Sequence, residues 1–533
     1  MSTTLPKPSS RELILDCQNR AADAPVYDLA QWTPVHEAKR LSSQLGNRLW
    51  LKREDLQPTF SFKLRGAYNC MRNLSDSQRQ CGVIAASAGN HAQGVALSAR
   101  ELGIDATIFM PRTTPEIKVR AVAELGAKIE LVGDDYDEAC AHALAEAEGT
   151  GAIFIHPFDN MDVIAGQGTI GIEIANQLPE EPEAIFLPVG GGGLAAGVAA
   201  NVKLVYPNVK VIGVEPADAA SMKAAIAAGY PVDIGTTGIF ADGVAVRQVG
   251  QTTFEMCREL LDDIVTVSVD QVCAAVKSIF EDVRAVAEPA GALAVAGAIE
   301  YSARHPVSES SKRGDWVALV SGANVNFDRL GHVVERCAFG DGSEALLSVT
   351  IPERPGSFLE FCRLLGASPV TEFNYRHNST ANARVFVGVR LTDSVEVLQG
   401  RMEKFGYQVI DLSDNEVAKL HLRHLVGGRL PVEERELLFR FEFPERPGAL
   451  LEFLEVLAGR WSISLFHYRN HGSAHGRVLA GFLVPQGDDT EFHKFLDDTH
   501  YHYTDETGNV IYQEFLSNHD ELKQADKQKL HLL

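Results

Sequence analysis

The 533-residue sequence predicts an α/β protein: a long part with parallel sheets and flanking helices, followed by a shorter α+β part. Two patterns carry this prediction. From about Val83 to Val214, short apolar segments alternate with amphipathic ones, which is typical of parallel strands joined by helices. After about Gly340 this alternation ends and an internal repeat begins. Because the chain is too long for a single hydrophobic core, we expect three or more domains.

The elements of the long part can be placed along the chain. Because the expected strands are apolar along their whole length, they predict a parallel sheet that helices cover on both faces. The strands are expected at Val83–Ala86, Ala106–Met110, Lys128–Val132, Ile153–Ile155, Ile185–Val189, Val209–Val214 and Trp316–Val320. The intervening helices are expected at Glu116–Leu125, Asp137–Glu148 and Ala165–Gln177.

The repeat covers Leu346–Arg376 and Leu438–Arg469. Both copies contain Pro-Glu-Arg-Pro-Gly, then Leu-Glu-Phe, then Phe-x-Tyr-Arg, which indicates a duplication. Each copy with its following segment reads strand, helix, strand, strand, helix, strand, a βαββαβ unit. The turn glycines Gly356 and Gly448 would lie where the first strand enters the helix. There they could let the backbone approach a small ligand, or they could merely permit the turn.

Composition and charge exclude several classes of function. The formal net charge of −22 argues against a partner such as nucleic acid, which requires a basic face. Glu12 and Asp16 lie where a signal or transit peptide would be apolar or basic, so neither is expected. The uncharged run from Ala184 to Val202 contains four consecutive glycines, which argues against a membrane span. The cysteines show no paired or metal-ligand spacing, which predicts reduced thiols and no metal site; they are Cys17, Cys70, Cys81, Cys140, Cys257, Cys273, Cys337 and Cys362.

One lysine has the surroundings of a catalytic amine. The segment Ser61-Phe62-Lys63-Leu64-Arg65-Gly66 follows the charged run Lys52-Arg53-Glu54-Asp55. A lysine amine can form a Schiff base with an aldehyde cofactor, and an adjacent aromatic ring can cover one face of that cofactor. A lysine in such a segment is more often a solvated surface group, so a catalytic role for Lys63 needs support from other motifs.

Three later loops supply those motifs. They are Ser87-Ala88-Gly89-Asn90-His91, Gly190-Gly191-Gly192-Gly193-Leu194 and Ser321-Gly322-Ala323-Asn324, and each is expected to follow a strand and open a helix. The glycine run would present backbone N–H groups to a phosphate at a helix N-terminus. An alternative is a dinucleotide site, because Gly190-x-Gly192-x-x-Ala195 with Glu215 about twenty residues later also fits that fingerprint.

Lys63 and the three loops together resemble the pyridoxal phosphate (PLP) site of the tryptophan synthase β-like (fold type II) enzymes. More narrowly, they resemble that of the biosynthetic threonine dehydratases. The resemblance implies that Lys63 binds the cofactor aldehyde and later removes the substrate Cα proton, and that Phe62 lies beside the ring. It further implies that Gly190, Gly191, Gly192, Gly193 and Leu194 hold the phosphate, that Asn90 binds the phenolic oxygen and that Ser321 faces the ring nitrogen.

The substrate would lie near two further segments. By the same resemblance, Ser87, Ala88, Gly89 and His91 surround the substrate carboxylate, although a lone histidine is more often structural. Glu288, in Ala287-Glu288-Pro289-Ala290-Gly291-Ala292, precedes a proline at a helix entrance and could face the cleft or remain a solvated first-turn carboxylate.

The resemblance implies a function for the whole chain. Residues 1–335 would form the catalytic domain in two α/β subdomains, and 344–415 and 437–507 two ACT-like regulatory domains. The expected reaction converts L-threonine, with L-serine as an alternative, to 2-oxobutanoate and ammonia on the route to isoleucine. Isoleucine would inhibit the enzyme, and valine would oppose that inhibition. The protein would be a cytoplasmic homotetramer. The rival interpretations are a dinucleotide-dependent oxidoreductase and a non-catalytic amino-acid sensor.

Overall fold

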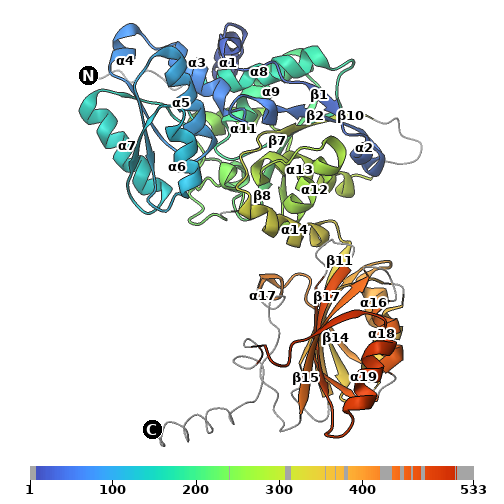
Figure 1. Ribbon diagram of the computed structural model, residues 1–533. Helices are drawn as coiled ribbons and strands as arrows, with labels where there is room; N and C mark the ends of the chain where they lie inside the picture. The colour runs from blue at the N-terminus through green and yellow to red at the C-terminus, as the bar shows by residue number, and fades with distance from the viewer. Residues whose placement is uncertain are drawn as a thin grey trace, which may run out of the picture. The chain divides into compact units, whose positions relative to one another are not determined.

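The computed structural model describes residues 8–238, 240–306, 314–354, 356–366, 368–376, 382–420, 435–444, 449–457, 460–469, 475–509 and 512. The chain forms two compact units, one that ends at Gly340 and one that begins at Asp341 (Figure 1). Gly448, which the repeat singled out, lies outside the described residues. Among the described helices, none combines the length and apolar character that a bilayer span requires. All eight cysteines are free thiols.

The larger sheet of the first unit has the strand order β1-β2-β10-β7-β8-β9, and every neighbouring pair is parallel except β1 with β2. Along β7, Ile185 and Leu187 belong to one apolar core while Ala184 and Phe186 belong to another. Because side chains alternate along a strand, the two cores cover opposite faces of this sheet. The strands are β1 (Val35–Glu37), β2 (Arg48–Arg53), β7 (Ala184–Pro188), β8 (Lys210–Pro216), β9 (Asp263–Val267) and β10 (Asp315–Val320).

Helices pack on both faces of the larger sheet. The core on one face includes residues of α1, α8, α9, α10 and α11, and the core on the other includes residues of α2, α12, α13 and α14. These helices are α1 (Ser10–Ala22), α2 (Lys39–Leu45), α8 (Met161–Gln177), α9 (Gly193–Val205), α10 (Ser221–Ala228), α11 (Gln251–Leu260), α12 (Val269–Val283), α13 (Pro289–Arg304) and α14 (Asp328–Gly340). Three short 3₁₀ turns are η1 (Val26–Asp28), η2 (Glu54–Leu56) and η3 (Asp242–Val244).

The smaller sheet of the first unit is wholly parallel and has the order β5-β4-β3-β6. Its strands are β3 (Val83–Ala86), β4 (Ala106–Met110), β5 (Lys128–Leu131) and β6 (Ile153–Phe154). The helices of this part are α3 (Lys63–Arg72), α4 (Asp76–Gln80), α5 (Asn90–Leu102), α6 (Glu116–Ala123) and α7 (Tyr136–Thr150). In Figure 1 they occupy the blue-to-cyan part of the first unit.

The strands expected from the sequence occur to within two residues of their predicted ends. The predicted parallel sheets with flanking helices are confirmed: β3 to β6 form one sheet, and β7, β8 and β10 belong to another. The apolar pattern alone did not show where this division falls. The loop that follows β10 differs from the expectation, since α14 begins only at Asp328 and not directly after Ser321-Gly322-Ala323-Asn324. Apolar strands show burial, but they do not show which strands pair.

Both copies of the repeat have the predicted βαββαβ order. The first comprises β11 (Glu344–Pro352), α15 (Ser357–Leu365), β12 (Val370–Arg376), β13 (Asn382–Arg390), α16 (Val395–Glu403) and β14 (Gln408–Asp411), and α17 (Glu416–Leu420) follows it. The second comprises β15 (Glu436–Pro444), α18 (Ala449–Leu457), β16 (Ser462–Arg469), β17 (His475–Leu483), α19 (Asp489–Asp498) and β18 (His502–Asp505). Antiparallel pairing of β12 with β16 joins the copies into one sheet with the order β14-β11-β13-β12-β16-β17-β15-β18.

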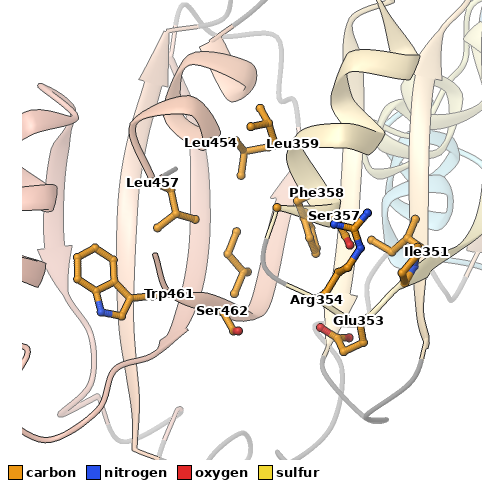
Figure 2. Close-up of a pocket in the computed structure, with 13 residues that line it drawn as sticks. Ile351, Glu353, Arg354, Ser357, Phe358, Leu359, Leu454, Leu457, Trp461 and Ser462 are labelled. Carbon is orange, nitrogen blue, oxygen red and sulfur yellow. The ribbon is translucent and has the colours of Figure 1, made fainter. Parts of the chain in front are cut away.

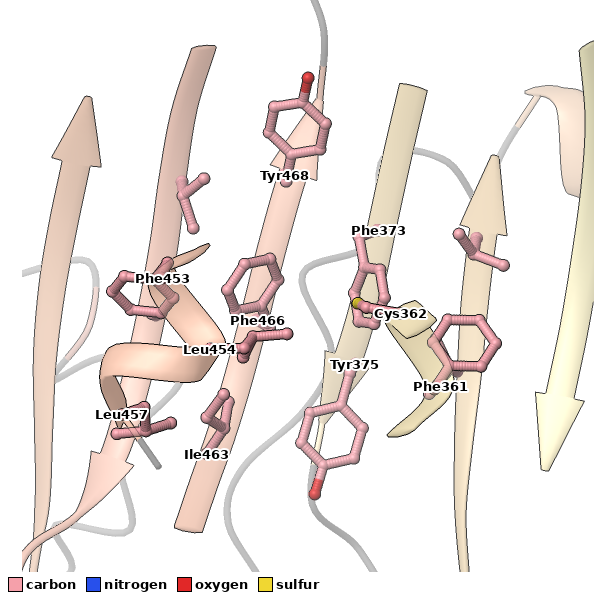
Figure 3. Packing of buried hydrophobic residues seen from close by; sticks show 14 of the residues in the cluster. Phe361, Cys362, Phe373, Tyr375, Phe453, Leu454, Leu457, Ile463, Phe466 and Tyr468 are labelled. Carbon is pink, nitrogen blue, oxygen red and sulfur yellow. The ribbon is translucent and has the colours of Figure 1, made fainter. Parts of the chain in front are cut away.

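One apolar core holds the two copies together (Figure 3). Phe373 of β12 and Phe466 of β16 meet edge to face with ring centroids 5.3 Å apart. Phe361 on α15 and Phe453 on α18 belong to the same core and are fully buried. Because buried aromatic pairs bridge the copies, the duplicated tail is a single packed unit.

Candidate active site

A cavity of about 520 Å³ lies where several separate segments of the first unit meet. The start of α3, the start of α5, the glycine run before α9 and the loop after β10 all contribute to its wall. Its lining residues are Phe62, Lys63, Asn90, Pro157, Phe158, Val163, Gln167, Pro188, Gly190, Gly191, Gly192, Gly193, Leu194, Gly243, Val244, Glu288, Ala290 and Ser321. A concave wall that combines apolar side chains with convergent polar groups such as Lys63, Asn90 and Glu288 is typical of a small-ligand site.

Lys63 is the first residue of α3, and its position depends on the loop after β10. The Phe62 backbone N–H donates to the Ser321 carbonyl at 3.2 Å. The Lys63 amine donates to the Pro157 carbonyl at 2.8 Å and lies 5.5 Å from the Phe62 ring centroid. Because burial removes the ammonium from water, the pKa of Lys63 is lowered to about 8. A lysine amine with that pKa is partly neutral near pH 8 and can act as nucleophile or base.

A buried ion-pair cluster anchors the first turn of α3. Arg65 contacts both carboxylate oxygens of Glu54 at 2.8 Å and one oxygen of Glu173 at 2.6 Å. The Lys52 amine also pairs with Glu173. All four side chains are 0 % exposed, so these charges interact without competition from solvent. The cluster joins α3 to β2, η2 and α8, and so fixes the helix that begins with Lys63.

The glycine run approaches its neighbours too closely for any side chain. A Cβ on Gly191 would lie 2.2 Å from Cγ of Phe158, and one on Gly193 would lie 2.7 Å from the Phe158 carbonyl oxygen. Gly192 has φ +92°, in the left-handed region that favours glycine. The first N–H groups of α9 have no intrahelical acceptor and, with the helix dipole, favour an anion at this end of the cavity.

Glu288 precedes α13 and lines the cavity; it is 6 % exposed and therefore not a solvated first-turn carboxylate. Asn90 Nδ2 donates to Glu288 Oε1 at 2.6 Å. Burial raises the pKa of Glu288 to about 7, although the hydrogen bond from Asn90 acts in the opposite direction. Ser321 donates its hydroxyl to the Ala290 carbonyl at 3.2 Å, and the helix that follows it in the chain, α14, begins only at Asp328.

Ser87, Ala88, Gly89 and His91 are absent from the cavity lining. His91 is buried, with Nε2 2.8 Å from the Ile155 carbonyl oxygen, and burial lowers its pKa to about 3. Its imidazole is therefore neutral and serves the packing of α5 against the smaller sheet. The Gly89 N–H donates to the Ser87 hydroxyl at 3.3 Å, which shapes the turn before Asn90. Their contact with a substrate carboxylate stays a prediction.

Sequence reasoning missed the uncharged part of the lining. Phe158 gave no signal, although its ring and carbonyl define the space beside the glycine run. Gly243 could have been suspected from its Asp-Gly turn, and Ala290 lies in the motif that contains Glu288. The other missed lining residues are Pro157, Val163, Gln167, Pro188 and Val244.

Glu215 does not serve as the acidic residue of a dinucleotide site. It is fully buried and is absent from the cavity lining. Its two carboxylate oxygens accept the backbone N–H groups of Met222 and Lys223 at 2.8 and 2.9 Å, at the start of α10. Burial raises its pKa to about 7. Because both Glu215 oxygens accept backbone N–H groups, Glu215 cannot bind the ribose hydroxyl as the dinucleotide fingerprint requires.

The groups around the cavity fit pyridoxal phosphate. Lys63 offers an amine of lowered pKa, and the glycine cradle offers backbone donors without side chains. Asn90 and Ser321 offer neutral polar groups for the ring substituents. Bound PLP supplies an aldehyde for the amine and an electron-withdrawing ring.

A second cavity, of about 440 Å³, lies in the second unit between the two copies of the repeat (Figure 2). Gly356, with φ +89°, leads into α15 at its edge. Ser357 is 2 % exposed, and its hydroxyl has no hydrogen-bond partner in the part of the chain that the structure describes. The remaining lining residues are Ile351, Pro352, Glu353, Arg354, Phe358, Leu359, Leu454, Leu457, Trp461, Ser462 and Ile463.

Comparison with protein families covers nearly the whole chain. Residues 26–322 match the model described as pyridoxal-phosphate dependent enzyme. Residues 335–422 and 427–516 each match the C-terminal regulatory domain of threonine dehydratase. The biosynthetic L-threonine dehydratase of Escherichia coli (strain K12) is 52% identical over 500 residues, which are 93% of this chain and 96% of that protein. The chain belongs to the biosynthetic threonine dehydratase family. Its cofactor is pyridoxal phosphate, and the dinucleotide interpretation is wrong.

Other members of the threonine dehydratase family are similarly close. The chloroplastic threonine dehydratase 1 of Solanum lycopersicum is 50% identical over 92% of this chain and 80% of its own length. The solved structure of processed threonine deaminase isoform 2 from the same plant has a TM-score of 0.59 and 48% identity, covering 62% of this chain and 94% of that one. These relatives support the fold type II assignment and the regulatory tail.

Proposed function

We propose that the chain is a threonine ammonia-lyase, which converts L-threonine to 2-oxobutanoate and ammonia by eliminating water, with L-serine as an alternative substrate. The observation that carries this proposal is the meeting of the Lys63 amine, the glycine cradle, Asn90 and Ser321 at one cavity. Close relatives over almost the whole chain are named as biosynthetic threonine dehydratases, which supports a role for the reaction on the route to isoleucine.

Each of the proposed site residues has a separate role in this reaction. Lys63 would hold the cofactor through its aldehyde, and its amine would accept the substrate Cα proton, for which a pKa of about 8 suits it. The backbone of Gly190 to Leu194 would hold the phosphate at the N-terminus of α9. Ser321 would offer the ring nitrogen a neutral hydroxyl, beside which the ring would withdraw fewer electrons than beside a carboxylate. This favours loss of a β-substituent over transamination.

A visible absorption spectrum followed by Lys63→Ala tests the catalytic proposal. The purified protein should show an imine-type band that borohydride abolishes. Lys63→Ala should lose this band and lower kcat by on the order of 10³ or more, because the amine is both attachment point and base. Arg100→Ala, on the exposed face of α5, is the control and should keep both properties. Near-normal dehydration by Lys63→Ala would contradict the assignment; a missing band would favour the amino-acid sensor.

We also propose that the second cavity binds the effectors isoleucine and valine. The α15 N-terminus suits the carboxylate of an amino acid, and so does the Ser357 hydroxyl, for which the described residues provide no hydrogen-bond partner. The Glu353 carboxylate, which accepts the Tyr375 hydroxyl at 2.8 Å, suits an ammonium group. The apolar side chains of Leu454 and Trp461 on the other copy suit an aliphatic side chain (Figure 2).

Ser357→Ala tests this regulatory proposal. Losing one hydrogen bond to a charged group should raise the isoleucine concentration for half-inhibition by about tenfold, with uninhibited kcat unchanged. Ser413→Ala is the matched control, because the Ser413 hydroxyl donates to Asp411 and accepts the Leu346 N–H in the same unit but does not line this cavity. If a chain that ends at Gly340 dehydrates threonine and isoleucine still inhibits it at the usual concentration, the effector does not bind the second unit.

The expected domain limits 1–335, 344–415 and 437–507, the cytoplasmic location and the homotetramer belong to the same proposal. The two family matches to the regulatory domain support a division of the tail between its copies. The bacterial biosynthetic relatives support the location.

A further inference from the structure

Three side chains beside the cavity form one chain of hydrogen bonds. Asn324, in the loop after β10, donates through Nδ2 to the Thr59 carbonyl and to Asn90 Oδ1, each at 2.7 Å. Asn90 then donates through Nδ2 to Glu288 Oε1 at 2.6 Å. Asn90 and Glu288 line the cavity, whereas Asn324 lies behind them and is absent from the lining.

The donor and acceptor roles in this series of hydrogen bonds are fixed by the Thr59 carbonyl. A backbone carbonyl can only accept hydrogen bonds, so the Asn324 atom that faces Thr59 must be the nitrogen. That nitrogen has two hydrogens, and the second points to Asn90, which must therefore present its oxygen. The Asn90 nitrogen is then forced onto the opposite side, where it faces Glu288. One of its hydrogens is used by Glu288, and among the described residues no group accepts the other, which is available to a ligand.

We propose that Asn324 is a positioning residue, whose amide sets the orientation of the Asn90 amide so that Asn90 presents N–H groups to Glu288 and to the cofactor. An Asn90 amide turned by 180° would place its oxygen against the carboxylate oxygen of Glu288. It would also offer the cofactor's phenolic oxygen an acceptor in place of a donor. The proposal rests on the pyridoxal phosphate cofactor of the family and on the proposed contact of Asn90 with it, and on no choice of substrate.

Backbone hydrogen bonds around Asn324 and Glu288 support a single orientation of the side-chain amides. The Glu288 N–H donates to the Gly322 carbonyl at 3.1 Å, and the Ala323 N–H donates to the Phe60 carbonyl at 2.9 Å. A Cβ on Gly322 would lie 2.5 Å from Glu288 Oε1, so the loop holds this carboxylate in close contact. With the backbone fixed on both sides, the amides can respond to a lost donor only by rotating.

Asn324→Leu and Asn324→Asp, made in the full-length holoenzyme, test the proposal. Leucine removes both donors at similar size, and aspartate keeps the shape but replaces the donor by an acceptor. Both variants should shift the visible band of the bound cofactor and change its pH dependence. Both should lower kcat by about tenfold, the effect of one hydrogen bond of roughly 1.4 kcal/mol. Asn324→Asp should shift the band at least as far as Asn324→Leu.

A double-mutant comparison separates positioning from general packing. In an Asn90→Ala background, Asn324→Leu should cause no further shift of the band and no further loss of kcat, because its effect passes through the Asn90 amide. Asn69→Leu is the matched control: Asn69 is buried and donates to the Asp162 carbonyl at 2.7 Å without contacting Asn90, so its variant should keep the parent band.

Two results would overturn the inference: an unchanged band in both Asn324 variants, or losses from Asn324→Leu and Asn90→Ala that multiply in the double variant. If Asn324→Leu does not fold, the same comparisons are made with Asn324→Asp, alone and with Asn90→Ala. The band reports the bound cofactor whatever the substrate, so failure of the threonine assignment would leave these results interpretable.

Discussion

Replacing Arg65 by methionine should expose how strongly the fold depends on the charge cluster at the start of α3. In the native chain, Lys52 and Arg65 balance Glu54 and Glu173, and all four side chains are buried. Methionine retains much of the volume of arginine but removes one positive charge. It also removes two contacts of 2.8 Å with Glu54 and one of 2.6 Å with Glu173.

The expected loss of folding stability is large because the remaining buried charges are not solvated by water. Breaking a buried ion pair by removing one partner typically costs about 3–5 kcal/mol, mostly through the uncompensated charge. Burial alone would raise the pKa of Glu54, but its pairing with Arg65 holds that pKa below the ordinary value. Without Arg65 the folded-state pKa should therefore rise. A raised folded-state pKa means that stability is lost as pH increases through it, so the deficit of Arg65→Met should be greater at pH 8 than at pH 5.5.

Urea unfolding of the apo forms at the two pH values measures this deficit. Adding Glu54→Gln to Arg65→Met restores charge balance and should recover about half of the loss at pH 8. Arg53→Met is the matched control, because Arg53 forms a similarly buried two-point pair with Asp55. It should destabilise the fold yet leave the cofactor band of the holoenzyme unchanged, whereas Arg65→Met should perturb that band. A loss below about 1 kcal/mol for Arg65→Met, or no recovery with Glu54→Gln, would refute the reasoning.

Two further predictions concern the cavity wall. Gly191→Ala should weaken cofactor binding at least tenfold in a titration of the apoenzyme, because its Cβ would lie 2.2 Å from the Phe158 ring; Gly149→Ala on α7, where nothing lies within 4 Å, should bind normally. Glu288→Gln should stabilise the apoenzyme at pH 8 by up to about 3 kcal/mol and have little effect at pH 4. Burial raises the Glu288 pKa from 4.5 to about 7, so its carboxylate lowers stability as pH rises through that range. Equal thermal shifts for Glu288→Gln at both pH values would contradict this.

The sequence allowed prediction of those features that depend on local pattern. Apolar strands, the glycine run and the duplicated tail are all short-range signals, and the structure has each of them in place. The pairing of strands is not a local property. The segments Val83–Ala86 and Ile185–Val189 look alike in the sequence, yet β3 and β7 belong to different sheets.

The charged run Lys52-Arg53-Glu54-Asp55 shows a second limit. Four consecutive charged residues are usually solvated, but here each is at most 5 % exposed. Burial becomes possible because partners come from distant segments, as when Glu173 of α8 meets both Lys52 and Arg65. No pattern within the run distinguishes a solvated face from a neutralised interior cluster, since the deciding charges lie elsewhere in the chain.

The same dependence on distant partners explains why motifs could indicate roles but not geometry. Asn324 and Thr59 are 265 positions apart, yet their hydrogen bond sets the orientation of the Asn324 amide behind Asn90. The Phe62 N–H donates to the Ser321 carbonyl, so the residue beside the lysine and the residue proposed to face the ring nitrogen are held by one contact. A shift of the backbone at Phe62 or Ser321 should therefore move both groups together. The cofactor spectrum, which senses the amine and the ring nitrogen at once, is for that reason a more sensitive probe of this site than turnover alone.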